Sequence, residues 1–456
     1  MTLIAHGLVG RSDLPIPEWL FGWAAAMVLV VSFVALAVLW PEPRLERERW
    51  RPLPGGLGRV LAGRPVQIAC GAIGVFLLGV VIYAGLRGTQ SPTANFTPTF
   101  VYVIFWLALV PVSLLFGDVF RAFNPWRAIG RAVGWLAGRI SRSDLPAPLS
   151  YPAGFGHWPA AAGIFAFAVM ELVVSDGDKP ENVAIAALVY SALTFVAMAL
   201  YGVESWIARG EAFSVYFNLI SRLSPVETRD GVVGLRRPLA GLAALEPVSG
   251  TVALLAVMIG SVTFDGASVG SLWTGIAPDI AGFFADAGLS PQRALELTFL
   301  VGLIGAILLV YAFYQLGVVG ARSVGGGFST GRLARAFVHS LVPIAVAYVA
   351  AHYLTLLLFQ GQSIAFLASD PLGDGSDLFG TADSQIDYSL LGANATWYCW
   401  VGLVVAGHVA ALTLAHDRAL ALYDDAKLAV RSQYWMLAVM VGFTSLALWL
   451  LSQVNS

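Results

Sequence analysis

Charged residues are scarce in this chain. Asp, Glu, Lys and Arg make up 12% of its 456 residues, whereas 58% are hydrophobic. So few charges do not suit the surface of a water-soluble protein of this size. The longest segments between apolar runs, 117–157 and 208–247, are also short for a separate soluble domain. The formal net charge of −2 gives no indication of a nucleic-acid partner. This composition predicts a chain that resides in the lipid bilayer.

Cysteine and the common catalytic motifs are also lacking. The two cysteines, Cys70 and Cys399, are expected near opposite ends of different membrane spans, so we predict no disulfide between them. The sequence contains no Walker A loop, no Gly-x-Ser-x-Gly elbow, no His-Glu-x-x-His and no dinucleotide fingerprint. These absences argue against ATP-driven work by this chain alone.

Ten apolar runs are present, and each has about the ~20 residues that a helix needs to cross ~30 Å of hydrocarbon. With the N-terminus outside, all but four of the 26 Lys and Arg residues fall in the inner segments, and this bias sets orientation. We predict an all-α polytopic membrane protein, a single helical bundle over 1–456 with both termini outside. The spans are expected at 19–40, 66–86, 99–116, 158–175, 183–207, 248–264, 297–317, 336–358, 395–415 and 432–452.

The longer connections have distinct characters. The outer segment 265–296 is amphipathic and is expected to cover the outer mouth of the bundle, whereas 359–394 is expected to be an acidic, turn-rich loop with Asp caps. The inner segments 117–157 and 208–247 are basic elbows, and residues 127–139 predict an amphipathic helix in the cytoplasmic interface.

The two inner elbows share a short pattern: Gly, an acid, one residue, Phe, and then Phe-Asn. It runs from Gly117 to Asn124 in the first elbow and, with one inserted residue, from Gly210 to Asn218 in the second. Two interpretations stay open, namely a parallel internal repeat and a chance similarity between two amphipathic elbows.

Ionisable side chains within membrane spans are costly and therefore mark candidate functional sites. Near the outer surface we expect Glu171, Asp265 and His352, with His6 on the N-terminal segment. Two carboxylates and an imidazole, with His6 as a further ligand, would suit a divalent metal ion. Such an ion would activate a water molecule as a nucleophile. The alternative is that the carboxylates are hydrated from outside and that His352 bonds to a neighbouring helix.

A second pair of histidines is expected near the inner surface. His339 and His408 lie on consecutive antiparallel spans at similar depth. Such a pair could bind haem as axial ligands, or form a metal or proton site. A polar contact between two helices would explain the same residues without a cofactor.

Short motifs spread over nearly the whole chain carry a family resemblance. They are Ala5-His6-Gly7 with Asp13-Leu14-Pro15, the elbow from Gly117-Asp118 to Trp126, Gly210-Glu211-Ala212-Phe213, Thr263-Phe264-Asp265-Gly266, His352-Tyr353, Gly361-Gln362, Ser369-Asp370-Pro371, Asp377 to Asp383, and Gly407-His408 through Ala415-His416-Asp417-Arg418. In these segments the chain resembles a family of bacterial multi-pass membrane proteins labelled fenitrothion hydrolase. The resemblance implies hydrolysis of an organophosphate phosphotriester by a protein of the bacterial plasma membrane.

Three classes of function remain open. A metal-dependent phosphotriester hydrolase would use Glu171, Asp265 and His352 to act on an apolar small molecule. A proton- or cation-coupled transporter would use Glu171, Asp118, Glu204, His339 and His352 as relay sites. A subunit of a redox complex would bind haem through His339 and His408, or dock membrane-protein partners on the Arg-rich elbows.

Overall fold

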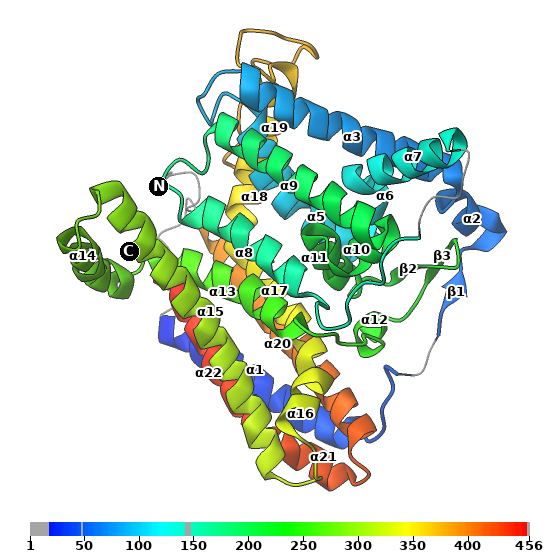
Figure 1. The fold of residues 1–456 in the computed structure, drawn as a ribbon. Coiled ribbons are helices and arrows are strands. Elements are labelled where there is room, and N and C mark those ends of the chain that lie inside the picture. Colours follow the sequence, from blue (N-terminus) through cyan, green and yellow to red (C-terminus); the bar gives the residue numbers. More distant parts are fainter. Residues whose placement is uncertain (1–17, 47–48, 142–146, 454–456) are drawn as a thin grey trace.

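The structure is a computed structural model that describes residues 18–46, 49–141 and 147–453 (Figure 1). It is 73% helical, which confirms the all-α class. Among the described residues, eight helical segments are long and apolar enough to cross a membrane, as expected of a multi-pass membrane protein. They are Gly22–Leu39, Arg64–Arg87, Phe96–Phe116, Pro180–Tyr201, Thr251–Ser268, Pro291–Ser323, Thr330–His352 and Ala393–Leu422.

The other two expected spans are also helical. α8 (Trp158–Leu172) has 15 residues, which is short for a span, and α22 (Tyr434–Gln453) has 20. The remaining longer helices are α1 (Glu18–Leu39), α3 (Arg64–Arg87), α7 (Pro125–Ile140), α9 (Pro180–Tyr201), α13 (Thr251–Ser268), α14 (Ser271–Asp286), α15 (Pro291–Ser323), α17 (Leu341–His352) and α20 (Ala393–Leu422).

The centre of the bundle is formed by α13 and α17. In the most apolar 18-residue stretch of Thr251–Ser268 and of Thr330–His352, 83% and 78% of the residues are buried, against 17–44% in the corresponding stretches of the other six candidate spans. α13 packs against α8, α15 and α17, and α17 packs along α20. The helices α1, α15 and α22 pack together on one side, while α3, α7 and α9 pack together on the other (Figure 1). Polar residues on α13 and α17 are therefore held inside the protein.

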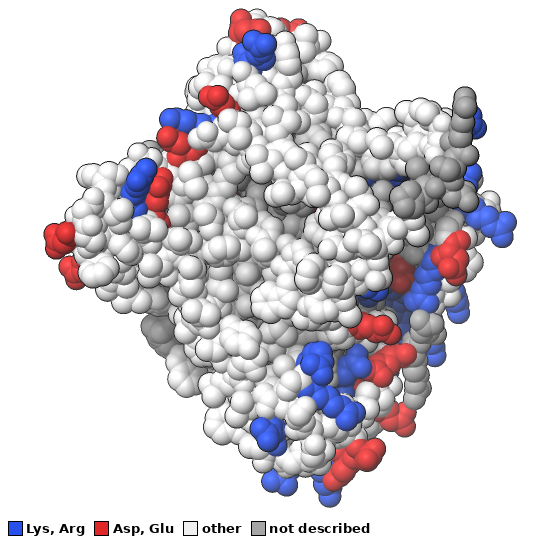
Figure 2. All heavy atoms as spheres, viewed as in Figure 1, with Lys and Arg blue, Asp and Glu red and all other residues white. Residues whose placement is uncertain are grey.

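Charged side chains gather at the margins of the molecule. In Figure 2 a broad area without charge separates acidic and basic side chains at the top and left from a mainly basic group at the lower right. We call the end with α14 and the acidic segment 370–392 the outer end, and the end with the Arg-rich elbows the inner end. The uncharged area between them fits the hydrocarbon region of a bilayer.

The first outer connection is largely helical, whereas the second begins with short helices and continues as a turn-rich segment. Residues 265–296 continue α13 to Ser268, form α14 and begin α15 at Pro291. In Figure 1 α14 projects from the left side of the bundle, and it lines none of the outer cavity described below. Residues 359–394 contain the end of α18 (Leu354–Gln360), η5 (Gly361–Ser363) and α19 (Ile364–Ser369). Only the part after α19 is turn-rich, and there Asp370 caps a turn by accepting from Asp374 N and Gly375 N, as predicted.

Two expected spans are irregular. The third begins as α4 (Phe96–Thr99), continues as a π-helix over Phe100–Ala108 and ends as α5 (Leu109–Phe116). The eighth begins with α16 (Thr330–Phe337) and η4 (Val338–Ser340), continues as α17 and is distorted at Tyr353 before α18. A π-helical stretch is rare and is frequently found at functional sites. Both irregular segments reach the outer cavity.

The inner elbows contain short helices and, contrary to a purely helical expectation, a small sheet. The short helices are α6 (Val119–Phe123), α10 (Val203–Arg209), α11 (Ala212–Ser221) and α12 (Ala240–Ala243). Strands β2 (Val226–Arg229) and β3 (Val232–Leu235) form an antiparallel hairpin, and β1 (Arg51–Pro52) joins it in the order β1-β3-β2. The remaining elements are η2 (Pro54–Gly56), α2 (Leu57–Leu61) and α21 (Ala426–Ser432). The predicted interfacial helix corresponds to α7.

The two elbows hold each other through the residues that they share. Asp118 caps α6, and its Oδ2 accepts from Asn218 Nδ2 of the second elbow at 2.9 Å. Glu211 caps α11, and its Oε2 accepts from Asn124 Nδ2 of the first elbow at 3.0 Å. Each acid therefore bonds to the asparagine of the other elbow, which favours an internal repeat over chance similarity. Burial raises the pKa of Asp118, although the Asn218 amide and the Arg121 guanidinium oppose that shift.

Candidate functional site

A cavity of about 360 Å³ lies at the outer end of the bundle. Apolar walls from α15, α18 and α19 surround a smaller number of polar groups. This mixture is typical of small-molecule sites, in which a few polar groups orient a largely apolar ligand. The polar lining includes Tyr102, Glu171, Asp178, Asp265, Gln360 and Tyr388.

Asp265 and His352 form a hydrogen-bonded pair of ionisable groups at this cavity. Asp265 lies on α13 and His352 is the last residue of α17, and Nε2 of the histidine lies 2.9 Å from Oδ2 of the aspartate. Their side chains are 2% and 5% exposed. The Tyr353 hydroxyl lies beside the same carboxylate. Asp265 belongs to the cavity lining and His352 does not, so the histidine supports the carboxylate from behind.

Glu171 lies near the end of α8 and faces the same cavity. It is close enough to Asp265 for the two carboxylates to interact electrostatically. Within the described part of the chain Glu171 has no hydrogen-bond partner, which leaves its carboxylate free for water or a ligand in the cavity. The structure thus brings Glu171, Asp265 and His352 to one place, as their similar depth along the sequence indicates.

The described donors do not fit the predicted metal site. Among residues 18–46, 49–141 and 147–453, no group of three or more His, Cys, Asp or Glu side chains is arranged to hold a metal ion. The fourth predicted ligand, His6, lies outside the described residues. The chemistry of this cavity is therefore derived from its protein groups alone.

The inner histidines do not enclose a haem-sized space. His339 in η4 and His408 in α20 are each 1% exposed, and Nδ1 of His408 donates to the Val404 carbonyl at 2.8 Å. His408 lines a largely apolar cavity of about 80 Å³ to which His339 does not contribute. Cofactor sites usually have about 300–1,000 Å³. These two residues as arranged do not fit a haem between them.

Two relay candidates of the transporter hypothesis are engaged elsewhere. Glu204 forms ion pairs with Arg121 at 2.7 Å and with Arg127 at 2.9 Å at the inner surface, where its side chain is 49% exposed. Asp118 is bonded to Asn218 in the contact between the elbows. Neither residue belongs to the lining of the outer cavity.

Sequence reasoning missed several residues of this site. Tyr102 projects from the π-helix, donates to the Gly177 carbonyl at 2.8 Å and lies near both Glu171 and Asp178. Asp178 follows α8 in a short connection, and Tyr388 reaches the cavity from the outer segment 370–392. Tyr102 could have been identified from the sequence, because it carries a hydroxyl group within an otherwise apolar span. No local signal distinguished Asp178 or Tyr388 from residues of ordinary surface loops.

Comparisons with protein-family models, with curated proteins and with solved structures found no significant match. The resemblance to the fenitrothion hydrolase family thus stays a prediction from the sequence. The function must be argued from the geometry of the cavity.

Proposed function

We propose that this protein hydrolyses an apolar phosphotriester in its outer cavity, from the outer side of a bacterial plasma membrane. The observation that carries the proposal is the Asp265–His352 contact of 2.9 Å in the wall of a cavity of about 360 Å³. A buried carboxylate with a fixed partner at a ligand-sized cavity is a typical general base. The reaction class comes from the family resemblance, and the alternation of basic segments supports the orientation.

The proposed reaction needs one water molecule and one neutral ester. Asp265 removes a proton from the water as its oxygen forms a bond to phosphorus, and the bond from phosphorus to the aryl oxygen breaks. The aryloxide leaves with the bonding electron pair, and the proton stays on Asp265 until solvent takes it. His352 donates from Nε2 to Asp265 Oδ2 and fixes its orientation. Glu171 orients the water from the other wall, while the apolar walls bind the organic groups.

Hydrolysis can be tested in detergent solution, where no gradient exists. We expect the purified protein to release nitrophenolate from a neutral nitrophenyl phosphotriester, which is followed by absorbance. Replacing His352 by Ala should lower turnover by about tenfold or more and change its pH profile, because Asp265 loses its fixed donor.

The metal content of the same two preparations tests the role given to His352. A stoichiometric divalent metal that is present in the wild type and lost from His352→Ala would identify His352 as a ligand. That result would contradict the role of His352 as a positioning residue.

A second function is favoured by a specific feature of α17. The helical backbone is distorted at Tyr353, directly beside Asp265, and irregular spans commonly form the solute and ion sites of transporters. A proton or cation between Glu171 and Asp265 would relieve the repulsion of two carboxylates in one cavity. The second proposal is proton- or cation-coupled transport of a small solute.

Flux measurements separate the two functions. If the protein is a transporter, sealed vesicles will take up solute in response to a proton or cation gradient, and Glu171→Gln will remove that dependence. Detergent-solubilised protein will then show no turnover. Turnover in detergent together with an absence of flux would contradict transport.

A further inference from the structure

A second cavity, of about 450 Å³, lies at the inner end of the bundle. It is bounded by the segment that follows α1, by β2, by α12 with the residues after it, and by α20. Among the described residues, its charged lining consists of four arginines, Arg49, Arg229, Arg236 and Arg418, and two glutamates, Glu46 and Glu246. The lining therefore has an excess of positive charge and is suited to an anion.

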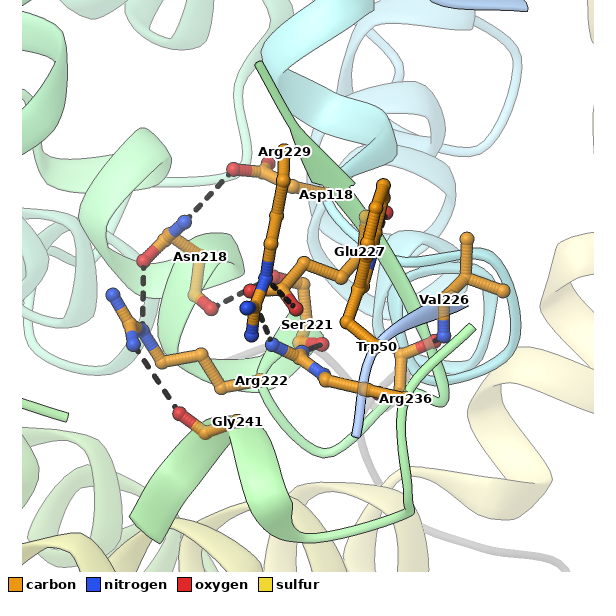
Figure 3. A network of polar contacts seen from close by, with 11 residues as sticks. Trp50, Asp118, Asn218, Ser221, Arg222, Val226, Glu227, Arg229, Arg236 and Gly241 are labelled. Atoms are coloured by element: carbon orange, nitrogen blue, oxygen red, sulfur yellow. Dashed lines mark hydrogen bonds and ion pairs between the residues drawn. The ribbon is translucent and has the colours of Figure 1, made fainter. Parts of the chain in front are cut away.

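Two of the arginines belong to a fixed polar network, which Figure 3 shows. Arg236 has a side chain that is only 6% exposed, and its Nη1 lies 3.0 Å from Glu227 Oε1. Arg229 Nε lies 2.8 Å from the other oxygen of the same carboxylate. Arg236 also donates to the backbone carbonyls of Ser221 and Ser224, each at 3.0 Å. One carboxylate thus contacts two guanidinium groups and holds both at the cavity wall.

The other two arginines have donors that the described protein groups do not use. Arg418 pairs through Nη1 with Glu46 at 2.8 Å and donates from Nη2 to the Ala243 carbonyl, but its Nε is buried and has no partner within the described ranges. Arg49 is exposed and, among the same residues, makes no hydrogen bond or ion pair. A buried donor without an acceptor is costly and is usually satisfied by a ligand or by water.

We propose that this inner cavity binds a phosphate group. The guanidinium fork matches the geometry of phosphate oxygens, and fixed arginines lose little conformational freedom when they bind. Arg229 and Arg236 form a rigid wall of the cavity, and Arg418 provides the unused Nε donor. The exposed side chain of Arg49 contacts the bound anion from the solvent side. The phosphate can come from an anionic lipid headgroup, since basic pockets at this face of membrane proteins bind such lipids, or from a soluble phosphate ester. The proposal does not depend on the chemistry of the outer cavity.

The test uses the full-length protein purified in detergent. Native mass spectrometry would count bound phosphatidylglycerol against phosphatidylcholine, and inorganic phosphate would be titrated against the thermal midpoint of unfolding. Arg49→Gln is expected to weaken binding by about tenfold, which corresponds to the loss of one charge-assisted hydrogen bond. Arg59→Gln is the matched control, because Arg59 is an exposed arginine of α2 outside the cavity lining.

Each outcome has a distinct meaning. A preference for phosphatidylglycerol that inorganic phosphate does not reduce assigns the cavity to a lipid headgroup. Competition by phosphate, with a rise in the thermal midpoint, assigns it to a soluble phosphate. Equal binding of the two lipids together with no phosphate effect would overturn the proposal, as would equal weakening by Arg49→Gln and Arg59→Gln. Arg418→Gln is a second variant that should also weaken binding of the anion. If Arg418→Gln does not fold, Arg49→Gln alone tests whether the inner cavity binds a phosphate group.

Discussion

Replacing Asp265 by Asn should reduce the hydrolysis of a neutral nitrophenyl phosphotriester by about 100-fold or more. The change removes the negative charge and the basic oxygen that accept the proton of the attacking water, and it keeps the size of the side chain. The amide oxygen of the substituted side chain would still accept a hydrogen bond from His352 Nε2, so the packing of α13 against α17 should survive. The measurement is the initial rate of nitrophenolate release in detergent, with the folded fraction determined from the thermal midpoint.

The matched control for this variant is Asp279→Asn. Asp279 is an exposed residue of α14 and does not line the outer cavity. The control variant should retain the wild-type rate within about twofold, since a substitution on the surface, away from the cavity and its hydrogen bonds, has a small effect. If Asp265→Asn is folded and retains more than about a third of the wild-type rate, Asp265 is not the base and the proposed mechanism is wrong.

Much of the outer site could be predicted because depth in a membrane is readable from the sequence. Helix rise places Asp265 and His352 at similar depth on different spans, 87 positions apart. A charged side chain inside a membrane span is costly unless it is paired, so a contact between the two residues could be expected. Depth does not say which helices are neighbours. The contact therefore became evident only from the packing of α13 on α17.

The limits of this reasoning are clear at the inner histidines and the irregular helices. His339 and His408 do lie in neighbouring elements, but the same depth argument says nothing about the size of the space between them. The π-helical stretch Phe100–Ala108 shows no distinct pattern in a segment that is apolar apart from Tyr102. The small sheet was missed because its strands have only two to four residues, although Asp230-Gly231 between β2 and β3 is a typical hairpin turn, and only β1 pairs across a long sequence separation.

Glu211→Ala should be the most destabilising of the substitutions considered, with a loss of about 3–5 kcal/mol in the free energy of unfolding. The side chain is 0% exposed and accepts four hydrogen bonds. The donors are the backbone amides of Phe213 at 3.0 Å and Ser214 at 2.8 Å, Asn124 Nδ2 at 3.0 Å, and the Tyr190 hydroxyl. Alanine would leave these donors buried without an acceptor and would also remove the cap of α11.

Glu204→Ala shows how much of the expected loss of stability in Glu211→Ala is due to the burial of the Glu211 side chain. Glu204 lies seven positions earlier, in α10, and pairs with two arginines. Its side chain is 49% exposed, and such surface pairs contribute about 0–1 kcal/mol. We expect a thermal midpoint in detergent within about two degrees of the wild type for Glu204→Ala and a decrease of several degrees for Glu211→Ala. Equal midpoints for the two variants would show that the contact between the elbows does not stabilise the fold. A selective loss in Glu211→Ala would show that the buried hydrogen bonds of Glu211, its contact with Asn124 among them, stabilise the fold.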